Sequence, residues 1–382
     1  MHSWIKENQI GKMPNDELLV EILECQNDTK IGHITLNSPE TLNSLTLNMV
    51  NEISNLLDKW EADPKIKMII IDGSGDKAFC AGGDIRALYE SMCSPDGPIF
   101  AETFFESEYR LDYKLHNFPK PIISIIDGIV MGGGAGLMFG SSYRISTERT
   151  KFAMPEIGVG LFPDVGFTSV IKDLPEGLGL YIMLTSTQLN AADTLFCNLT
   201  DCSLSSEDLE KFFREIQETE WKDKKKDNLK ILNAIVHQDR YIKKINNFPK
   251  SKLKDELSNI QSLANASNLI EVAENILSNP SKDEWYLKGK ESLKRGSPTS
   301  AHLIWLQCQN SSHLDLKEVF QFELNLAIQI TRMGDFKEGI RALIIDKDNE
   351  AKWKYDSISN TPSVWLERHT DLAWDTNPLE DL

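Results

Sequence analysis

The sequence is short of positive charge, of long apolar runs and of closely spaced cysteines, and each shortage excludes a class of protein. It has 41 Lys and Arg residues against 58 Asp and Glu residues, a net charge of -17. Nucleic-acid binding is therefore not expected, because phosphates require clustered basic side chains. No apolar run approaches the roughly 20 residues that cross a bilayer. The six cysteines show no C-x-x-C spacing, which predicts reduced thiols in a reducing compartment.

Common catalytic and nucleotide-binding motifs are also missing. Neither H-E-x-x-H nor G-x-S-x-G occurs, so zinc-hydrolase and serine-hydrolase mechanisms have no support. The GGGAG run at 132–136 does not satisfy G-x-G-x-x-G, and GSGDK at 73–77 lacks the GK[ST] of a phosphate loop. Dinucleotides and nucleoside triphosphates are therefore not expected as ligands.

The length of the chain and the distribution of strand and helix patterns predict two regions. At 382 residues the chain exceeds one average domain, and strand signals become rare beyond Leu184, where charged helical patterns dominate. We expect a catalytic core at 15–185 and a mainly helical region at 186–382. The opening 17 residues lack the apolar segment of a secretion signal and the Arg-rich composition of a transit peptide. The expected location is the cytoplasm, or the mitochondrial matrix if the chain is eukaryotic.

The first part of the chain alternates strand, helix and strand. Short runs rich in β-forming residues at Leu18–Leu23 and Ile31–Asn37 predict a hairpin. Thr46 is a candidate N-cap for a helix whose apolar residues recur every three or four positions up to Trp60. A buried strand at Met68–Ile71 follows. This alternation predicts a layered α/β core.

Two glycine clusters follow predicted strands and open predicted helices. One is CAGGD, with Gly83 before a helix that begins near Asp84, and the other is GGG at 132–134. The first amides of a helix have no internal partner and lie at the positive end of its dipole. We therefore expect both clusters at one edge of a sheet, where their N–H groups can bind an electron-rich atom.

Two carboxylates lie downstream in an apolar segment. Glu156 and Asp164 are eight residues apart in MPEIGVGLFPD, from Met154 to Asp164. When a carboxyl group is buried among apolar residues, its pKa shifts, and its hydrogen bonds influence whether it is ionised. Oxyanion donors followed by two placed carboxylates suggest acyl chemistry.

Three segments carry a family resemblance: DKAFCAGGDIRAL, PKPIISIIDGIVMGGGAGLMFG and KFAMPEIGVGLFPDVG. They resemble the crotonase (enoyl-CoA hydratase/isomerase) superfamily, specifically its 3-hydroxyisobutyryl-CoA hydrolase branch. Similar matches near both ends, LNSPETLNSLTLNMV and DFKEGIRALIIDKDNEAKWK, extend the likeness over nearly the whole chain. The spacing of MPE and FPD is what indicates that branch.

The resemblance implies an α/β fold, a crotonase-like spiral of ββα repeats with a C-terminal helical region. It implies an acyl-CoA thioester substrate whose oxyanion binds the backbone amides of Gly83 and Gly133. Glu156 and Asp164 fall on the family's catalytic carboxylates, and Glu108 falls on a position that lines its substrate pocket. Gly136 stands where hydratases carry a second catalytic Glu, which disfavours water addition.

The implied reaction is hydrolysis of 3-hydroxyisobutyryl-CoA, or a similar short 3-hydroxyacyl-CoA, in valine breakdown. CoA is part of the substrate, and no cofactor or metal is expected. Glu156 either activates water or attacks to form an anhydride, and the sequence leaves both routes open. Other readings are an enoyl-CoA isomerase or hydratase and a non-catalytic acyl-CoA-binding protein. The exact acyl group and homo-oligomer formation also stay open.

Overall fold

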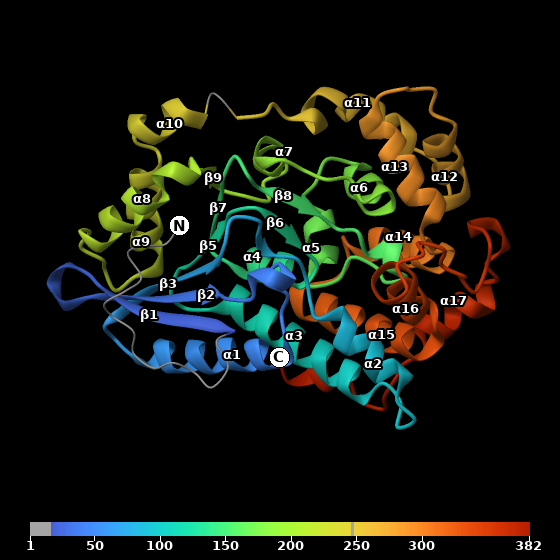
Figure 1. Cartoon of the computed structure of the whole chain (residues 1–382), viewed down its shortest axis with the longest axis horizontal. Coiled ribbons are helices and arrows are strands. Elements are labelled where there is room, and N and C mark those ends of the chain that lie inside the picture. Colours follow the sequence, from blue (N-terminus) through green and yellow to red (C-terminus); the bar gives the residue numbers. More distant parts are fainter. Residues whose placement is uncertain (1–16, 246–247) are drawn as a thin grey trace. The chain divides into compact units, whose positions relative to one another are not determined.

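The computed structural model describes residues 17–245 and 248–382 (Figure 1). The prediction that the first 17 residues form neither a secretion signal nor a transit peptide concerns residues that lie almost entirely outside this range. Backbone contacts divide the chain into two compact units, each made of three segments. Unit 1 comprises 1–83, 114–152 and 189–252, and unit 2 comprises 84–113, 153–188 and 253–382. These units alternate along the sequence, so the linear division at residue 185 stays a prediction.

Unit 1 is built on a six-stranded sheet. Its order is β1 (Leu18–Glu24), β2 (Lys30–Leu36), β3 (Ile66–Gly73), β5 (Ile122–Ile126), β7 (Tyr143–Ser146) and β9 (Cys202–Ser203). The β1–β2 pair is antiparallel, as the predicted hairpin requires, and the later pairs are parallel. The two central parallel strands, β3 (IKMIIIDG) and β5 (IISII), are rich in Ile, which is the pattern expected when both faces of a sheet are covered.

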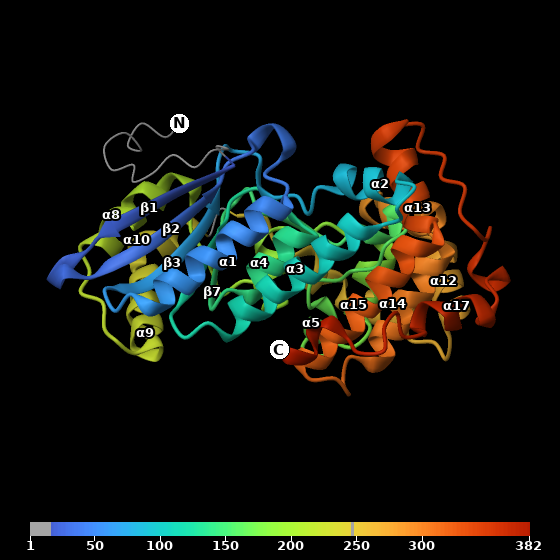
Figure 2. The same cartoon turned by 90° about the horizontal axis from the view of Figure 1, so that it is seen from below.

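Helices cover both faces of this sheet (Figures 1 and 2). On one face lies α1 (Leu47–Ala62), capped by Thr46 as predicted, with Trp60 so close to Gly32 that a Cβ there would lie 2.5 Å from its ring. On the other face, α8 (Leu209–Gln217) and α9 (Lys225–Val236) bury residues such as Phe212 and Leu232 against the strands. The predicted layered α/β core is confirmed in this unit.

Further elements of unit 1 extend from this core. A three-stranded sheet contains β4 (Ala78–Cys80), β6 (Ile129–Met131) and β8 (Lys151–Ala153). Its helices also include α4 (Gly133–Gly140), α7 (Ala191–Phe196) and α10 (Asp239–Ile245).

Unit 2 is mainly helical. Its earlier helices are α2 (Ile85–Cys93), most of α3 (Ile99–Asn117), α5 (Phe167–Ile171) and α6 (Leu178–Thr185). The C-terminal ones are α11 (Lys252–Ala264), α12 (Leu269–Ser278), α13 (Glu284–Arg295), α14 (Pro298–Asn310), α15 (Leu316–Met333), α16 (Asp335–Ile340) and α17 (Ser363–Thr370). Non-helical segments at 279–283 and 296–297 separate α12 from α13 and α13 from α14. A π-helix, Arg341–Ile345, follows α16.

Within the described ranges, no helix combines the length and the apolarity that crossing a lipid bilayer would demand.

Candidate active site

The two glycine clusters meet at one edge of the small sheet in unit 1. β4 and β6 are parallel neighbours, so their carboxyl ends lie at the same edge, and each strand is followed by one cluster. A Cβ added to Gly82 would lie 3.9 Å from the backbone N of Gly133. Gly83 forms an isolated parallel β-bridge with Leu45. The predicted placement of both clusters at a single sheet edge is therefore confirmed.

The local backbone explains why this edge is made of glycine. Gly132 caps α4 with a φ of 47°, and Gly82 has a φ of 110°, both in the region that favours glycine. A Cβ on Gly134 would lie 2.3 Å from the carbonyl oxygen of Cys80. Gly133 is the first residue of α4, and the N–H at that position has no partner within its helix.

Glu156 begins a short 3₁₀ turn, Glu156–Val159, in unit 2. Its side chain is buried, and within the described chain its Oε2 has no hydrogen-bond partner. The turn is held by later segments: the N–H of Ser297 donates to the carbonyl of Ile157 at 2.9 Å. α16 packs so tightly on the turn that a Cβ on Gly339 would lie 2.1 Å from the carbonyl oxygen of Val159. The C-terminal region thus fixes the backbone that carries Glu156.

Asp164 is buried in the same unit and has a defined partner. The phenol of Tyr109, from α3, donates to its Oδ2 at 2.6 Å. Burial raises the pKa of Asp164 to about 6, and the Tyr109 hydrogen bond partly opposes that rise. At neutral pH this carboxyl group can therefore accept hydrogen bonds as an anion.

The α3 helix adds two more buried acids. Glu108 and Asp112 are one turn apart on its buried face, whereas Glu106 is partly exposed and pairs with Arg110. Oε1 of Glu108 and both carboxyl oxygens of Asp112 have no hydrogen-bond partner in the part of the chain that is described. Burial is the main cause that raises the pKa of both groups well above their usual values. Burial therefore favours the neutral form of both acids more than water would.

Charge coupling links these acids into one cluster. Burial and, secondarily, the charge of Asp164 raise the pKa of Glu156 well above its ordinary value. The same charge acts on Glu108, Asp112 and Glu323, and burial raises the pKa of Glu323 to about 8. A base with a raised pKa is suited to proton transfer near neutral pH. No described group of three or more His, Cys, Asp or Glu side chains is arranged to hold a metal ion.

Sequence reasoning proposed Glu156, Asp164 and Glu108 as site residues, and all three lie buried in unit 2. Gly83 and Gly133 lie in unit 1. Sequence reasoning did not propose Tyr109, Asp112 or Glu323 as site residues. A signal existed for the two acids, because each occupies an apolar stripe of its helix: Asp112 lies between Leu111 and Leu115, and Glu323 follows Val319 and Phe320.

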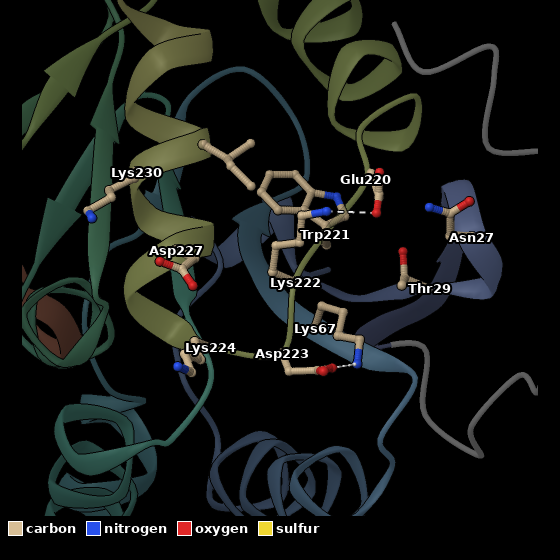
Figure 3. Close-up of a pocket in the computed structure, with 11 residues that line it drawn as sticks. Asn27, Thr29, Lys67, Glu220, Trp221, Lys222, Asp223, Lys224, Asp227 and Lys230 are labelled. Atoms are coloured by element: carbon tan, nitrogen blue, oxygen red, sulfur yellow. Dashed lines mark hydrogen bonds and ion pairs between the residues drawn. The ribbon is translucent and has the colours of Figure 1, made fainter.

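An open pocket of about 820 Å³ lies elsewhere in unit 1, beside Trp221 (Figure 3). Its lining includes Asp223 and Lys224 from the charged run DKKK at 223–226. Two of its lysines are paired with acids: Lys67 with Asp223 at 2.5 Å and Lys222 with Glu220 at 2.7 Å. Because three acids, Glu220, Asp223 and Asp227, line the pocket beside its four lysines, the pocket is not strongly basic and gives no argument for an anion-binding site.

Comparisons with known proteins agree with this architecture. The sequence profile of the enoyl-CoA hydratase/isomerase family matches residues 31–370. Two relatives, both named mitochondrial 3-hydroxyisobutyryl-CoA hydrolase, are 35% identical to the chain. The Danio rerio protein aligns over 89% of this chain and 86% of its own length, and the Homo sapiens protein over 93% and 88%.

Solved structures give the same result. A carnitinyl-CoA dehydratase from Mycobacterium thermoresistibile is similar with a TM-score of 0.83 and 26% identity, over 96% of this chain and all of that one. An enoyl-CoA hydratase from Rhodobacter sphaeroides has a TM-score of 0.80 and 27% identity, over 94% and 98%. The chain therefore belongs to the crotonase, or enoyl-CoA hydratase/isomerase, family.

Proposed function

We propose that this protein is an acyl-CoA thioester hydrolase that acts on 3-hydroxyisobutyryl-CoA or a closely similar short 3-hydroxyacyl-CoA. The observation that carries the proposal is the buried pair of Glu156 and Asp164, one with an unpaired oxygen and the other bonded to a phenol. The relatives that are 35% identical bear the name of this hydrolase. The family's hydratases use a second glutamate in the helix after the glycines, where this chain has Gly136.

Hydrolysis requires an oxygen nucleophile at the thioester carbonyl and release of the CoA thiol. As the carbon–oxygen bond forms, the carbonyl oxygen becomes negative, and the C–S bond then breaks. We assign the N–H groups of Gly83 and Gly133 to this oxyanion. Preorganised donors of this kind stabilise the transition state more than the ground state, and loss of one typically costs about 100- to 1,000-fold in rate.

Glu156 drives the attack in this proposal. As a general base it takes a proton from water, and its burial raises its pKa toward the pH at which it works. As a nucleophile it forms a mixed anhydride that water then cleaves. Both routes yield the hydroxy acid and CoA. Reaction in water that carries isotopically labelled oxygen distinguishes them, by whether label is found in the Glu156 carboxyl group. Label enters the protein only by the anhydride route.

We assign Asp164 and Glu108 to the acyl group. An ionised Asp164 accepts the hydrogen bond of the substrate hydroxyl, and Glu108 offers the acyl group a buried carboxyl oxygen, Oε1, that has no hydrogen-bond partner in the described chain. A plain acyl group leaves the Asp164 bond unmade, and an unpaired buried polar group is costly. The site should therefore prefer hydroxylated over plain esters.

Thiol release from a small panel of CoA esters tests the function. The panel comprises 3-hydroxyisobutyryl-CoA, 3-hydroxypropionyl-CoA, isobutyryl-CoA and an enoyl-CoA, with released thiol followed by a colorimetric reagent. We expect the highest kcat/KM for one of the two hydroxylated esters and no thiol from the enoyl ester. Isomerised or hydrated enoyl-CoA without thiol would indicate the isomerase or hydratase reading instead. Tight binding of every ester without turnover would indicate a binding protein.

The remaining parts of the proposal concern context. The relatives' names describe mitochondrial proteins, and we extend a mitochondrial location to this chain as part of the proposal. A role in valine breakdown follows if the preferred ester is the hydroxyisobutyryl one. The reaction as written needs no cofactor beyond the CoA of the substrate, and activity that survives exhaustive chelation would agree with that.

A further inference from the structure

The turn that carries Asp164 has an unfavourable backbone. Val165 has a φ of 53° and Gly166 a φ of 85°, so two successive residues lie in the left-handed region. This region is rare and strained for a β-branched residue such as Val. Such a conformation persists only where its surroundings impose it.

Glu323 imposes it by direct hydrogen bonding. Its Oε2 accepts the N–H of Gly166 at 2.7 Å, and its Oε1 accepts the N–H of Thr168 at 3.0 Å. Amides that converge after left-handed residues form a concavity that binds acceptor oxygens, and here both oxygens come from one carboxyl group of the protein. Glu323 is fully buried in the middle of α15, so its position is set by the packing of that helix.

The same helix also positions the other partner of Asp164. The ring of Phe320, one turn before Glu323, lies 5.9 Å from that of Tyr109 between centroids. A Cβ on Gly166 would lie 3.0 Å from the tip of the Phe320 ring. α15 therefore contacts both the phenol that binds Asp164 and the turn from which Asp164 projects.

We propose that Glu323 is a positioning residue for Asp164: its two carboxyl oxygens hold the Asp164–Thr168 backbone in the conformation that presents Asp164 to the substrate hydroxyl. This inference rests on the proposed function and adds a residue that does not itself touch substrate. It predicts that Glu323 controls discrimination between hydroxylated and plain acyl groups, because Asp164 is the group that senses the hydroxyl.

Glu323→Gln tests the inference. The amide keeps the size of the side chain but has only one acceptor, so one of the two N–H groups loses its partner. For the hydroxylated ester we expect kcat/KM to fall by roughly ten- to a hundredfold, the scale for a reacting group misplaced by about 1 Å. For the plain ester we expect a fall of less than threefold. The ratio of the two kcat/KM values is the readout, and loss of folded protein leaves it unchanged.

Asn325→Asp is the matched control. Asn325 is also buried and polar on α15, but its amide donates to the carbonyls of His369 and Asp371, away from the Asp164 turn. This change should lower stability and leave the ester ratio at its wild-type value. A Glu323→Gln protein with the wild-type ratio would overturn the inference, as would an Asn325→Asp protein with the same altered ratio.

Val165→Gly supplies a rescue. Glycine adopts a φ of 53° without a steric penalty, so the turn no longer depends on Glu323 to the same degree. In the Glu323→Gln background we expect this second change to restore part of the lost ratio, and no restoration would contradict the role of the turn. If Glu323→Gln does not fold alone, the double variant is measured in its place. A wild-type protein that releases no thiol from any ester refutes the proposed function instead.

Discussion

Replacing Tyr109 by Phe tests the electrostatics of the acid cluster. The change removes the 2.6 Å hydrogen bond to Asp164 and leaves the aromatic ring in place. Burial holds the pKa of Asp164 at about 6 despite this bond. A hydrogen bond to a charged group contributes about 1.5–3 kcal/mol, and one pKa unit corresponds to about 1.36 kcal/mol. The pKa of Asp164 should therefore rise by about one to two units.

The assay must separate Asp164 from Glu156, whose pKa is also raised. Both esters depend on Glu156, so its titration cancels in the ratio of kcat/KM for the hydroxylated ester to that for the plain ester. In the wild type we expect this ratio to increase with pH around a midpoint near 6, as Asp164 ionises. In Tyr109→Phe a higher pH is needed to ionise the group, so the midpoint moves up.

The control is Tyr113→Phe, which removes a phenol from the same helix. Tyr113 packs edge-on against Phe320, whereas the phenol that donates to Asp164 at 2.6 Å is that of Tyr109. Its midpoint should equal that of the wild type. An unchanged midpoint in Tyr109→Phe would refute the reasoning, because it would mean that the phenol does not stabilise the Asp164 anion.

Three further predictions concern stability. Gly134→Ala places a Cβ 2.3 Å from the carbonyl of Cys80, and we expect urea unfolding to show a loss of about 1–3 kcal/mol; Gly158→Ala, where nothing lies within 4 Å, should cost less than half of that. Asp112→Leu removes a buried carboxyl without partners in the described chain, so a gain of about 1–3 kcal/mol is expected, and a loss would contradict the absence of partners. Burial raises the pKa of Glu323 from 4.5 to about 8, so the folded chain retains this proton when the unfolded chain has lost it. The free energy of unfolding should therefore fall as pH rises between 4.5 and about 8, by up to about 1.4 kcal/mol per pH unit, and Glu323→Gln should remove that part of the slope.

Local patterns in the sequence predicted most of unit 1. The hairpin at 18–36, the helix capped by Thr46 and the helix that opens at Gly133 all form where propensity, capping and periodicity agree. The apolar segment around Glu156 and Asp164 marked these two acids, and the family resemblance then added their catalytic role and the candidate Glu108. These features are encoded within a few residues of one another, so a single segment suffices to recognise them.

The remainder depends on contacts between distant segments. Tyr109 lies 55 residues from Asp164, and Glu323 lies 157 residues from Gly166. The periodicity of α3 marks Tyr109 only as a buried aromatic residue. No local rule indicates that Val165 adopts a left-handed backbone, because its own preference opposes it. Sequence analysis therefore identified the acids and missed the residues that hold them in place.

The central claim is that Glu156 drives thioester cleavage, and Glu156→Gln tests it most directly. The amide is nearly the same size and can neither accept the proton nor form the anhydride. Thiol release from 3-hydroxyisobutyryl-CoA should fall by about 100- to 10,000-fold, while the affinity for the unhydrolysed ester, measured by calorimetry, stays within a few-fold of wild type. Undiminished thiol release by a folded Glu156→Gln protein would contradict the account.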